Sequence, residues 1–296
     1  MKTPALPQTA PPIARRLASL ASACLTTFQG PRAGHGHGRA LASLAAACLT
    51  MTLLATAALA QGPSDPAKAP PTAEALLAAM DRNLQFDTRS VRATMTVDDG
   101  RATRTYQMQS FSRGLDEAAV EYLSPARDKG TRMLKQQDNL WLFIPRAERV
   151  QKISGHLLRQ GMMGSDLSYE DFMQATQFLD LYTAKVTGEA TVNGRPCWKL
   201  EATAKNDTVS YPRRVILIDK AWLLPVQQEL FALSGMLLKT WTMSDVRMIQ
   251  DRPVAHRMEF KDQVRKGSTT VLALEDVLFG VKLEAEVFSR RWLERK

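Results

Sequence analysis

The chain has 296 residues, with 39 Lys and Arg against 30 Asp and Glu, a net charge of +9, and three cysteines. Residues 1–60 hold five of the basic residues and none of the acidic ones, so the rest of the chain carries 34 basic and 30 acidic side chains, a net charge of +4. This small excess removes the main support for nucleic-acid binding. After residue 60, Cys197 stands alone, which excludes an intramolecular disulfide there.

The start of the chain has the pattern of a secretory signal peptide. A basic stretch is followed from Leu41 by an Ala- and Leu-rich run that ends at Ala58-Leu59-Ala60, with small residues where signal peptidase requires them. This run is too short for a stable membrane span. We therefore predict an exported protein with the leader 1–60 cleaved near Ala60. Residues 61–72 contain four prolines and no apolar periodicity, which predicts a disordered linker before a single domain over residues 73–296.

One helix and then many strands are predicted along this domain. Apolar side chains from Leu76 to Leu84 recur at helical spacing after a possible N-cap at Thr72, which predicts a helix over residues 72–86. From about residue 90, short alternating or densely apolar runs follow one another between turn-like segments. We count about eleven strands joined as neighbours, and a sheet of that size must curl. The sequence predicts a mainly β (α+β) fold, a strongly curved antiparallel sheet or open barrel.

The helical segments are too few to cover such a sheet. In the run NLWLFIP, Leu140 and Leu142 point to one side while Trp141 and Phe143 point to the other, so both faces of this strand need cover. Helices are expected at only three places, namely residues 72–86, 168–180 and 284–294. Because a sheet face needs a packed layer about 10 Å thick, we expect an apolar hollow on the concave face that is only partly filled.

The segment GMMGSDLSYEDFM, residues 161–173, concentrates polar side chains between methionines. Ser168 and Asp171 have the spacing of a capping box, with Leu167 and Phe172 as the hydrophobic staple, so a helix is expected to begin there. The preceding GMMG either forms a flexible opening to an apolar pocket or is a plain loop with two buried methionines.

Metal-binding and catalytic patterns are poorly represented. The chain lacks the calcium-loop pattern, G-x-S-x-G and H-E-x-x-H, and His156 and His256 are the only histidines after the leader. His256 is expected to be structural. We therefore expect no enzyme activity, no metal and no cofactor.

Residues 140–172, LWLFIPRAERVQKISGHLLRQGMMGSDLSYEDF, carry a specific resemblance. They are similar to the signature of the LolA-like outer-membrane lipoprotein-sorting family, in which a W-x-x-x-P strand precedes a basic strand and an M-G-S-D-x-[ST]-Y-E-D helix start. Weaker similarity extends over the chain after the leader. The resemblance implies an unclosed antiparallel barrel with a few short helices plugging its concave face.

The resemblance also implies a periplasmic carrier that shields the acyl chains of lipoproteins or other lipids on their way to the outer membrane. Expected partners are these acyl chains, an inner-membrane lipid transporter and, transiently, a membrane surface, but no nucleic acid. Strand parity leaves open which sheet face is concave. The expected cavity-wall or lid residues are Trp141, Phe143, Met162, Met163, Phe172 and Met173. The residues expected to hold the lid by hydrogen bonds are Asp166, Ser168, Tyr169 and Asp171.

Two alternatives remain open at this point. The same half-open barrel can serve as a lipid-sensing regulatory module of a membrane-bound signalling or transporter system. Residues 127–159 hold eight basic side chains against three acidic ones. This segment is either a solvated sheet edge that discourages aggregation or a docking surface for anionic headgroups or an acidic transporter.

Overall fold

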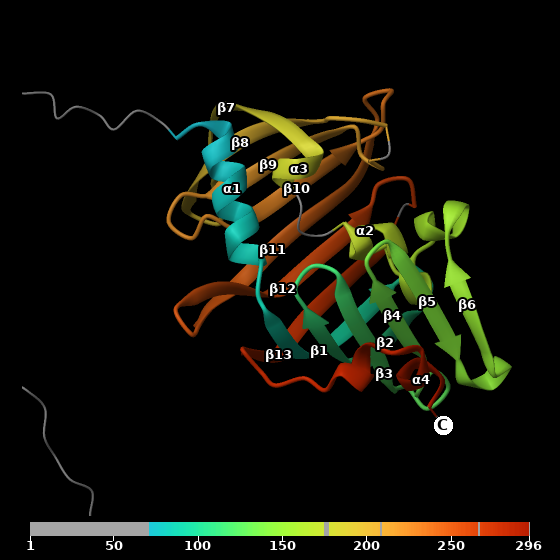
Figure 1. Cartoon of the computed structure of the whole chain (residues 1–296). Coiled ribbons are helices and arrows are strands. Elements are labelled where there is room, and N and C mark those ends of the chain that lie inside the picture. The colour runs from blue at the N-terminus through green and yellow to red at the C-terminus, as the bar shows by residue number, and fades with distance from the viewer. Residues whose placement is uncertain (1–70, 175–177, 208, 266, 296) are drawn as a thin grey trace, which may run out of the picture. The chain divides into compact units, whose positions relative to one another are not determined.

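A computed structural model describes residues 71–174, 178–207, 209–265 and 267–295, which all belong to the compact unit Lys68–Lys296. The predicted signal peptide, residues 1–60, and most of the predicted linker lie outside the described residues. Within the described unit, the strands form one antiparallel sheet in the order β6-β5-β4-β3-β2-β1-β13-β12-β11-β10-β9-β8-β7 (Figure 1).

The elements follow the predicted order of one helix and then successive hairpins. The strands are β1 Thr88–Asp98, β2 Thr103–Arg113, β3 Glu117–Ser124, β4 Arg132–Gln136, β5 Asn139–Ile144, β6 Arg149–Ile153, β7 Tyr182–Val192, β8 Arg195–Ala204, β9 Arg213–Asp219, β10 Pro225–Phe231, β11 Leu237–Ile249, β12 Arg252–Asp262 and β13 Thr269–Phe279. The α-helices are α1 Ala73–Leu84, α2 Tyr169–Met173, α3 Phe178–Leu181 and α4 Arg290–Glu294. Four short 3-10 helices are η1 Pro145–Ala147, η2 Gly155–Arg159, η3 Met162–Gly164 and η4 Ala285–Phe288.

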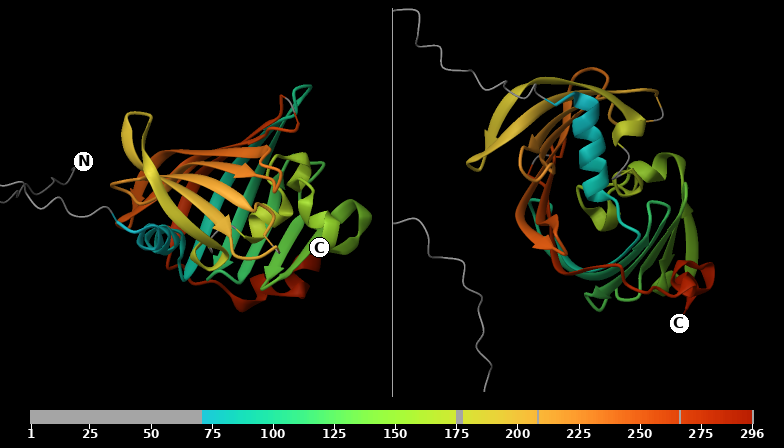
Figure 2. Two further views of the ribbon diagram at one scale, coloured as in Figure 1. Left: turned by 90° about the horizontal axis from the view of Figure 1, so that it is seen from above. Right: turned by 60° about the vertical axis from the view of Figure 1, so that its left-hand side comes forward.

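The sheet is curved and open, as predicted. Its edge strands β6 and β7 do not pair with each other. In the middle of the sheet, β1 pairs with β13, which joins the first and last strands of the chain. Figure 2 shows the strands curving around α1 and α2. The described residues form thirteen strands rather than about eleven, because each of the short apolar runs after residue 90 is a strand of its own. Neighbouring strands mostly follow one another in sequence because short turns join them.

The concave face carries the largest group of buried apolar side chains. On β1, Val91, Ala93, Met95 and Val97 alternate with more exposed residues, so one side of the strand faces inward. The buried residues of this concave-face cluster are Val91, Ala93, Met95, Val97, Tyr106, Met108, Val120, Tyr122, Met133, Leu140, Leu142, Ile153, Met162, Tyr169 and Val277.

The helix α1 covers the other half of the concave side. The side chain of Thr72 accepts a hydrogen bond from the backbone N–H of Ala75 at 3.2 Å, which confirms the predicted N-cap. Leu76, Leu77 and Met80 of α1 are buried in a second cluster with side chains of β7, β8 and β9. This helix therefore fills one end of the curved sheet and leaves the β1–β4 half to other segments.

The C-terminal helical segment packs on the opposite, convex face, so of the three expected helical segments it is the one that does not plug the concave side. Phe288, Trp292 and Leu293 form a buried cluster with Ala119 of β3 and Leu134 of β4. We call this group the convex-face cluster. Because β3 to β6 bear apolar side chains on both sides, η4 and α4 are needed to cover the outer one.

Candidate functional site

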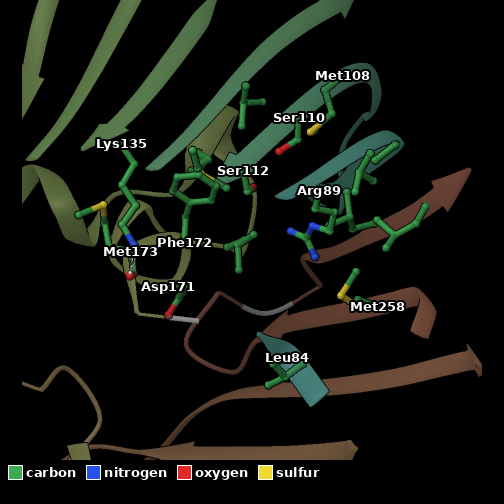
Figure 3. Close-up of a pocket in the computed structure, with 18 of the residues that line it drawn as sticks. Leu84, Arg89, Met108, Ser110, Ser112, Lys135, Asp171, Phe172, Met173 and Met258 are labelled. Carbon is green, nitrogen blue, oxygen red and sulfur yellow. Dashed lines mark hydrogen bonds between the residues drawn. The ribbon is translucent and has the colours of Figure 1, made fainter. Parts of the chain in front are cut away.

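A cavity of about 290 Å³ lies on the concave face, near the lower end of the range for small-molecule sites (Figure 3). Strands β1–β4 form one wall with side chains such as Met95, Val120 and Met133, and β11–β13 contribute others such as Phe260 and Leu272. Seven of the lining residues are methionines. Methionine is flexible and polarizable and adapts to irregular apolar partners. The cavity therefore suits an apolar ligand of variable shape.

Residues 161–174, which we call the lid segment, border this cavity. The hydroxyl of Ser168 accepts from the N–H of Asp171 at 3.1 Å, and the N–H of Ser168 donates to the Asp171 carboxylate at 2.8 Å. This is the predicted capping box, and it starts α2 where expected. Phe172 and Met173 of α2 line the cavity, as do Met162 and Leu167 before it.

The carboxylate of Asp171 ties the lid segment to the far half of the sheet. Its Oδ2 lies 2.6 Å from Nζ of Lys239 on β11, and its Oδ1 accepts from the hydroxyl of Tyr211 at 2.7 Å. Burial and the adjacent Asp171 carboxylate raise the pKa of Tyr211, so its hydroxyl stays protonated and can donate. One buried carboxylate thus both caps α2 and joins it to two distant segments.

Asp166 makes a second attachment of the lid segment, to β13. The backbone N–H of Asp166 donates to Oγ1 of Thr270 at 2.9 Å, and this hydroxyl donates in turn to Oδ2 of Asp166 at 2.7 Å. Both residues are buried. Buried polar groups need such partners, because an unpaired one costs about 1–3 kcal/mol.

The GMMG sequence forms a tight turn with a buried methionine. Met162 is buried, and the N–H of Met162 donates to the carbonyl of Leu167 at 2.9 Å. A Cβ atom placed on Gly161 would lie 2.0 Å from the carbonyl oxygen of Ser165, so only glycine fits there. Gly164 has a φ of +76°, which favours glycine. The glycines therefore serve a close backbone approach. Met162 is buried but Met163 only partly so, and the alternative of a flexible opening stays a prediction.

Trp141 and Phe143 do not line the cavity, so their predicted place in its wall is wrong. Leu140 and Leu142 of β5 belong to the concave-face cluster, and strand alternation sends the two aromatic side chains to the other side. Trp141 and Phe143 pack there against the convex-face cluster. The guanidinium of Arg290 in α4 lies 5.0 Å from the centre of the Trp141 ring.

The other predicted site residues lie close together around the lid segment. Met162, Phe172 and Met173 line the cavity, whereas Met163 packs against the concave-face cluster beside it. Tyr169 is also buried in that cluster, and its backbone N–H donates to the carbonyl of Gln160 at 3.1 Å. Whether any of these side chains binds a lipid stays a prediction.

Three charged residues at the cavity were missed by the sequence analysis, namely Arg89, Glu117 and Lys135. Lys135 of β4 donates from Nζ to the backbone carbonyls of Leu115 at 2.7 Å and Met173 at 3.1 Å, which fixes the end of α2. Arg89 lies at the start of β1 and also lines the cavity. Strand alternation could have found Arg89, because it is two positions before Val91 and therefore lies on the same inward face of β1.

The described residues contain no group of three or more His, Cys, Asp and Glu side chains placed to hold a metal ion. In the same part of the chain, no helix is long and apolar enough to cross a membrane. His256 is buried, with Nδ1 3.0 Å from the carbonyl oxygen of Val254, a local contact that needs no catalytic role.

Comparison with known proteins places the fold. A family model described as "Uncharacterized protein" matches residues 114–295, which is more than half of the chain. No curated protein matches the chain. A DUF1329 family protein from Desulfovibrio piger is 25% identical with a TM-score of 0.69, and the match covers 74% of this chain and 97% of that one.

Two further solved structures are similar. A domain named for outer membrane lipoprotein sorting, from Vibrio parahaemolyticus, is 24% identical with a TM-score of 0.66 over 74% of this chain and 98% of that one. A LolA superfamily protein from Nitrosomonas europaea is 21% identical with a TM-score of 0.63 over 75% and 99% of the two chains. Because the family model covers more than half of the chain, the chain belongs to the family that this model describes, and the solved structures show that its open thirteen-stranded sheet has the LolA-like fold.

Proposed function

We propose that the protein is a periplasmic carrier that binds acyl chains of lipoproteins or other lipids in the concave cavity and moves them toward the outer membrane. The observation that supports this proposal most is an apolar, methionine-rich cavity beneath a short capped helix. The family's fold and the predicted signal peptide agree with a periplasmic location, and the carrier function requires no catalytic residue.

The physical basis is the cost of exposing an acyl chain to water. Each methylene transferred from water to an apolar site contributes about 0.8 kcal/mol, so a cavity that takes even part of a chain offsets much of this cost. The contribution depends on area rather than on headgroup chemistry, which suits a carrier that must also release its cargo. A site of this kind needs an opening, and α2 is the element that borders it.

Opening at α2 is favoured by the way the lid segment is attached. The helix has five residues, too short to be stable alone. Its attachments to the rest of the sheet include a few polar contacts, from Asp171 to Lys239 and Tyr211 and from Asp166 to Thr270. Besides the apolar packing of Met162 and Tyr169, few polar contacts hold the segment, so its release would leave the hydrogen bonds between strands intact.

The basic segment 127–159 is the surface that we propose to meet anionic membrane headgroups or a lipid transporter of the inner membrane. Six of its eight basic side chains are exposed, while Arg132 is buried and Lys135 bonds to backbone carbonyls. The exposed ones are Arg127, Lys129, Arg146, Arg149, Lys152 and Arg159. Each cation near an anionic surface contributes about 1 kcal/mol to membrane attraction, which is enough for transient contact.

The proposal is tested by native mass spectrometry of protein taken from the periplasm and by transfer of a fluorescent fatty acid between vesicles. We expect copurified lipid and transfer that rises with protein concentration. Phe172→Ser, in the cavity wall, should reduce transfer several-fold, whereas Leu278→Ser, at an exposed position on β13, should not. Absence of both copurified lipid and transfer would overturn the carrier proposal, and a stable complex with a membrane-bound signalling protein without transfer would favour the lipid-sensing alternative.

A further inference from the structure

Part of the cavity lining is polar, and the cation Arg89 belongs to it. Arg89 is on the inward-facing side of β1 together with Val91 and Ala93, and Figure 3 shows its guanidinium pointing into the cavity. Its register partner on β2 is Ser112, which also lines the cavity, as does Ser110 two positions before it. A cation and two serine side chains therefore border one end of a mainly apolar space.

The guanidinium of Arg89 lacks the partners that the other charged groups of the cavity have. Its Nε is buried without a hydrogen-bond acceptor among the described residues, and the neighbour that it does contact is the ring of Phe86, with the guanidinium carbon 4.3 Å from the ring centre. A ring face attracts a cation, but it accepts none of the five N–H groups in the way that an oxygen does.

The other charged side chains that line the cavity are already engaged. Asp171 is paired with Lys239 at 2.6 Å, and Glu117 lies 2.5 Å from Nε of Arg113. Lys135 is hydrogen-bonded to two backbone carbonyls. Among the described lining residues, Arg89 is thus the charged side chain for which the protein itself supplies neither an ion-pair partner nor a hydrogen-bond acceptor.

Burial without an anion is costly for a cation, and the cost is visible in the acidity of the group. Burial lowers the pKa of Arg89 to about 10, because the apolar surroundings disfavour its charged form. The group still carries its proton at neutral pH. An anion that entered the cavity would remove this cost and meet a planar fork of donors that matches a carboxylate or a phosphate.

We propose that the cavity binds amphiphiles with a single anionic headgroup, a carboxylate or a phosphate, and that Arg89 pairs with this headgroup while the alkyl chain lies along the methionine-rich walls. The proposal rests on the proposed lipid-carrier function and adds a cargo class to it. Ser110 and Ser112 border the same end and can donate further hydrogen bonds to the anion.

The test compares three ligands with the same twelve-carbon chain: laurate, dodecyl phosphate and dodecanol. Their affinities are measured by isothermal titration calorimetry on the full protein. We expect the wild type to bind at least one of the two anions about tenfold or more tightly than dodecanol, since a charge-assisted, bidentate pair is among the stronger polar contacts. The order of laurate and dodecyl phosphate then identifies the carboxylate or the phosphate as the natural headgroup.

Variants assign the preference to Arg89. Arg89→Met should bring the anions to the level of dodecanol and leave dodecanol binding unchanged, and Arg89→Lys should retain part of the preference. Arg92→Met is the matched control, because Arg92 lies on the same strand with an exposed side chain that reaches Asp276 at 3.7 Å. It should behave as the wild type.

The outcomes separate this inference from the carrier function. Equal binding of dodecanol and both anions by the wild type would overturn the role of Arg89 and leave the carrier function in place. Loss of dodecanol binding in Arg89→Met would also overturn it, because Arg89 would then support the fold rather than a headgroup. Failure of all three ligands to bind the wild type would contradict the carrier function itself.

Discussion

Replacing Lys239 by methionine removes the cation that holds the lid segment to β11. The ammonium of Lys239 lies 2.6 Å from Oδ2 of Asp171, and the two side chains are 12% and 0% exposed. Lys239→Met keeps a long apolar side chain of similar volume, so the change removes charge without opening a large cavity. Asp171 is left with Tyr211 and the backbone N–H of Ser168 as donors.

The expected cost follows from the burial of this pair. Removing one partner of a buried ion pair costs about 3–5 kcal/mol, because the remaining charge stays buried without compensation. Since Asp171 keeps two strong hydrogen bonds, we expect the lower end, about 3 kcal/mol. A free-energy change of about 1.4 kcal/mol changes an equilibrium constant tenfold. A cost of about 3 kcal/mol should therefore raise the population of the detached lid segment by about two orders of magnitude.

Hydrogen exchange of the amides in residues 161–174 measures this population, and urea unfolding reports whether the rest of the sheet is affected. The control is Lys185→Met on β7, whose side chain is 74% exposed and lies 3.8 Å from Glu201. Exposed pairs of this kind are worth about 0–1 kcal/mol. If Lys239→Met exchanged no faster in the lid segment than Lys185→Met, the Asp171 contact would not be what holds α2 in place.

Three further predictions test other parts of the structure. Trp141→Asp should lower the urea midpoint, because Trp141 packs under α4, yet leave ligand affinity of the folded protein unchanged; abolished binding would mean that this side chain does reach the cavity. Gly161→Ala should destabilise the protein by about 1–3 kcal/mol in urea unfolding, because the added Cβ overlaps the Ser165 carbonyl, and an unchanged midpoint would contradict this. Burial acts to raise the pKa of Asp219, but hydrogen bonds from Arg195 and from two backbone N–H groups outweigh it and lower the pKa. A folded pKa below the unfolded value of about 3.9 stabilises the fold above that pH, and the effect is lost as pH falls through the folded pKa. Asp219→Asn should therefore be destabilised at pH 7, and its difference from the wild type should shrink as the pH is lowered below the unfolded value; a constant difference in urea midpoint would argue against this account.

The basic segment 127–159 provides a test of how the proposed carrier contacts a membrane. If the exposed basic side chains of residues 127–159 dock on anionic headgroups, transfer should be faster to anionic than to zwitterionic vesicles and should slow as salt is raised, because salt screens exposed charges over about 10 Å at 0.1 M. A combined Arg146→Ser and Arg149→Ser variant should lose part of the anionic advantage, since both side chains are exposed. Equal rates on both vesicle types would leave this segment with its edge-protecting role.

Local patterns in the sequence were sufficient for elements that depend on neighbours along the chain. The capping box at Ser168 and Asp171 could be predicted because both residues lie within one helical turn, where spacing alone determines contact. The strands could be predicted for a similar reason, since each alternating run pairs mostly with the next one in sequence. An open curved sheet with an apolar concave side follows from the number of these runs and the scarcity of helices.

Contacts between distant segments were decided only by the tertiary structure. Alternation shows that Leu142 and Trp141 face opposite sides of β5, but it carries no information on which side is concave, because that depends on the hand of the sheet and on where the C-terminal segment packs. The partner of Asp171 on β11 is 68 residues away, and nothing near either residue announces the pair. The unpaired state of Arg89 likewise emerges only in the folded sheet, since burial is a property of the packed chain and not of a residue's neighbours in sequence.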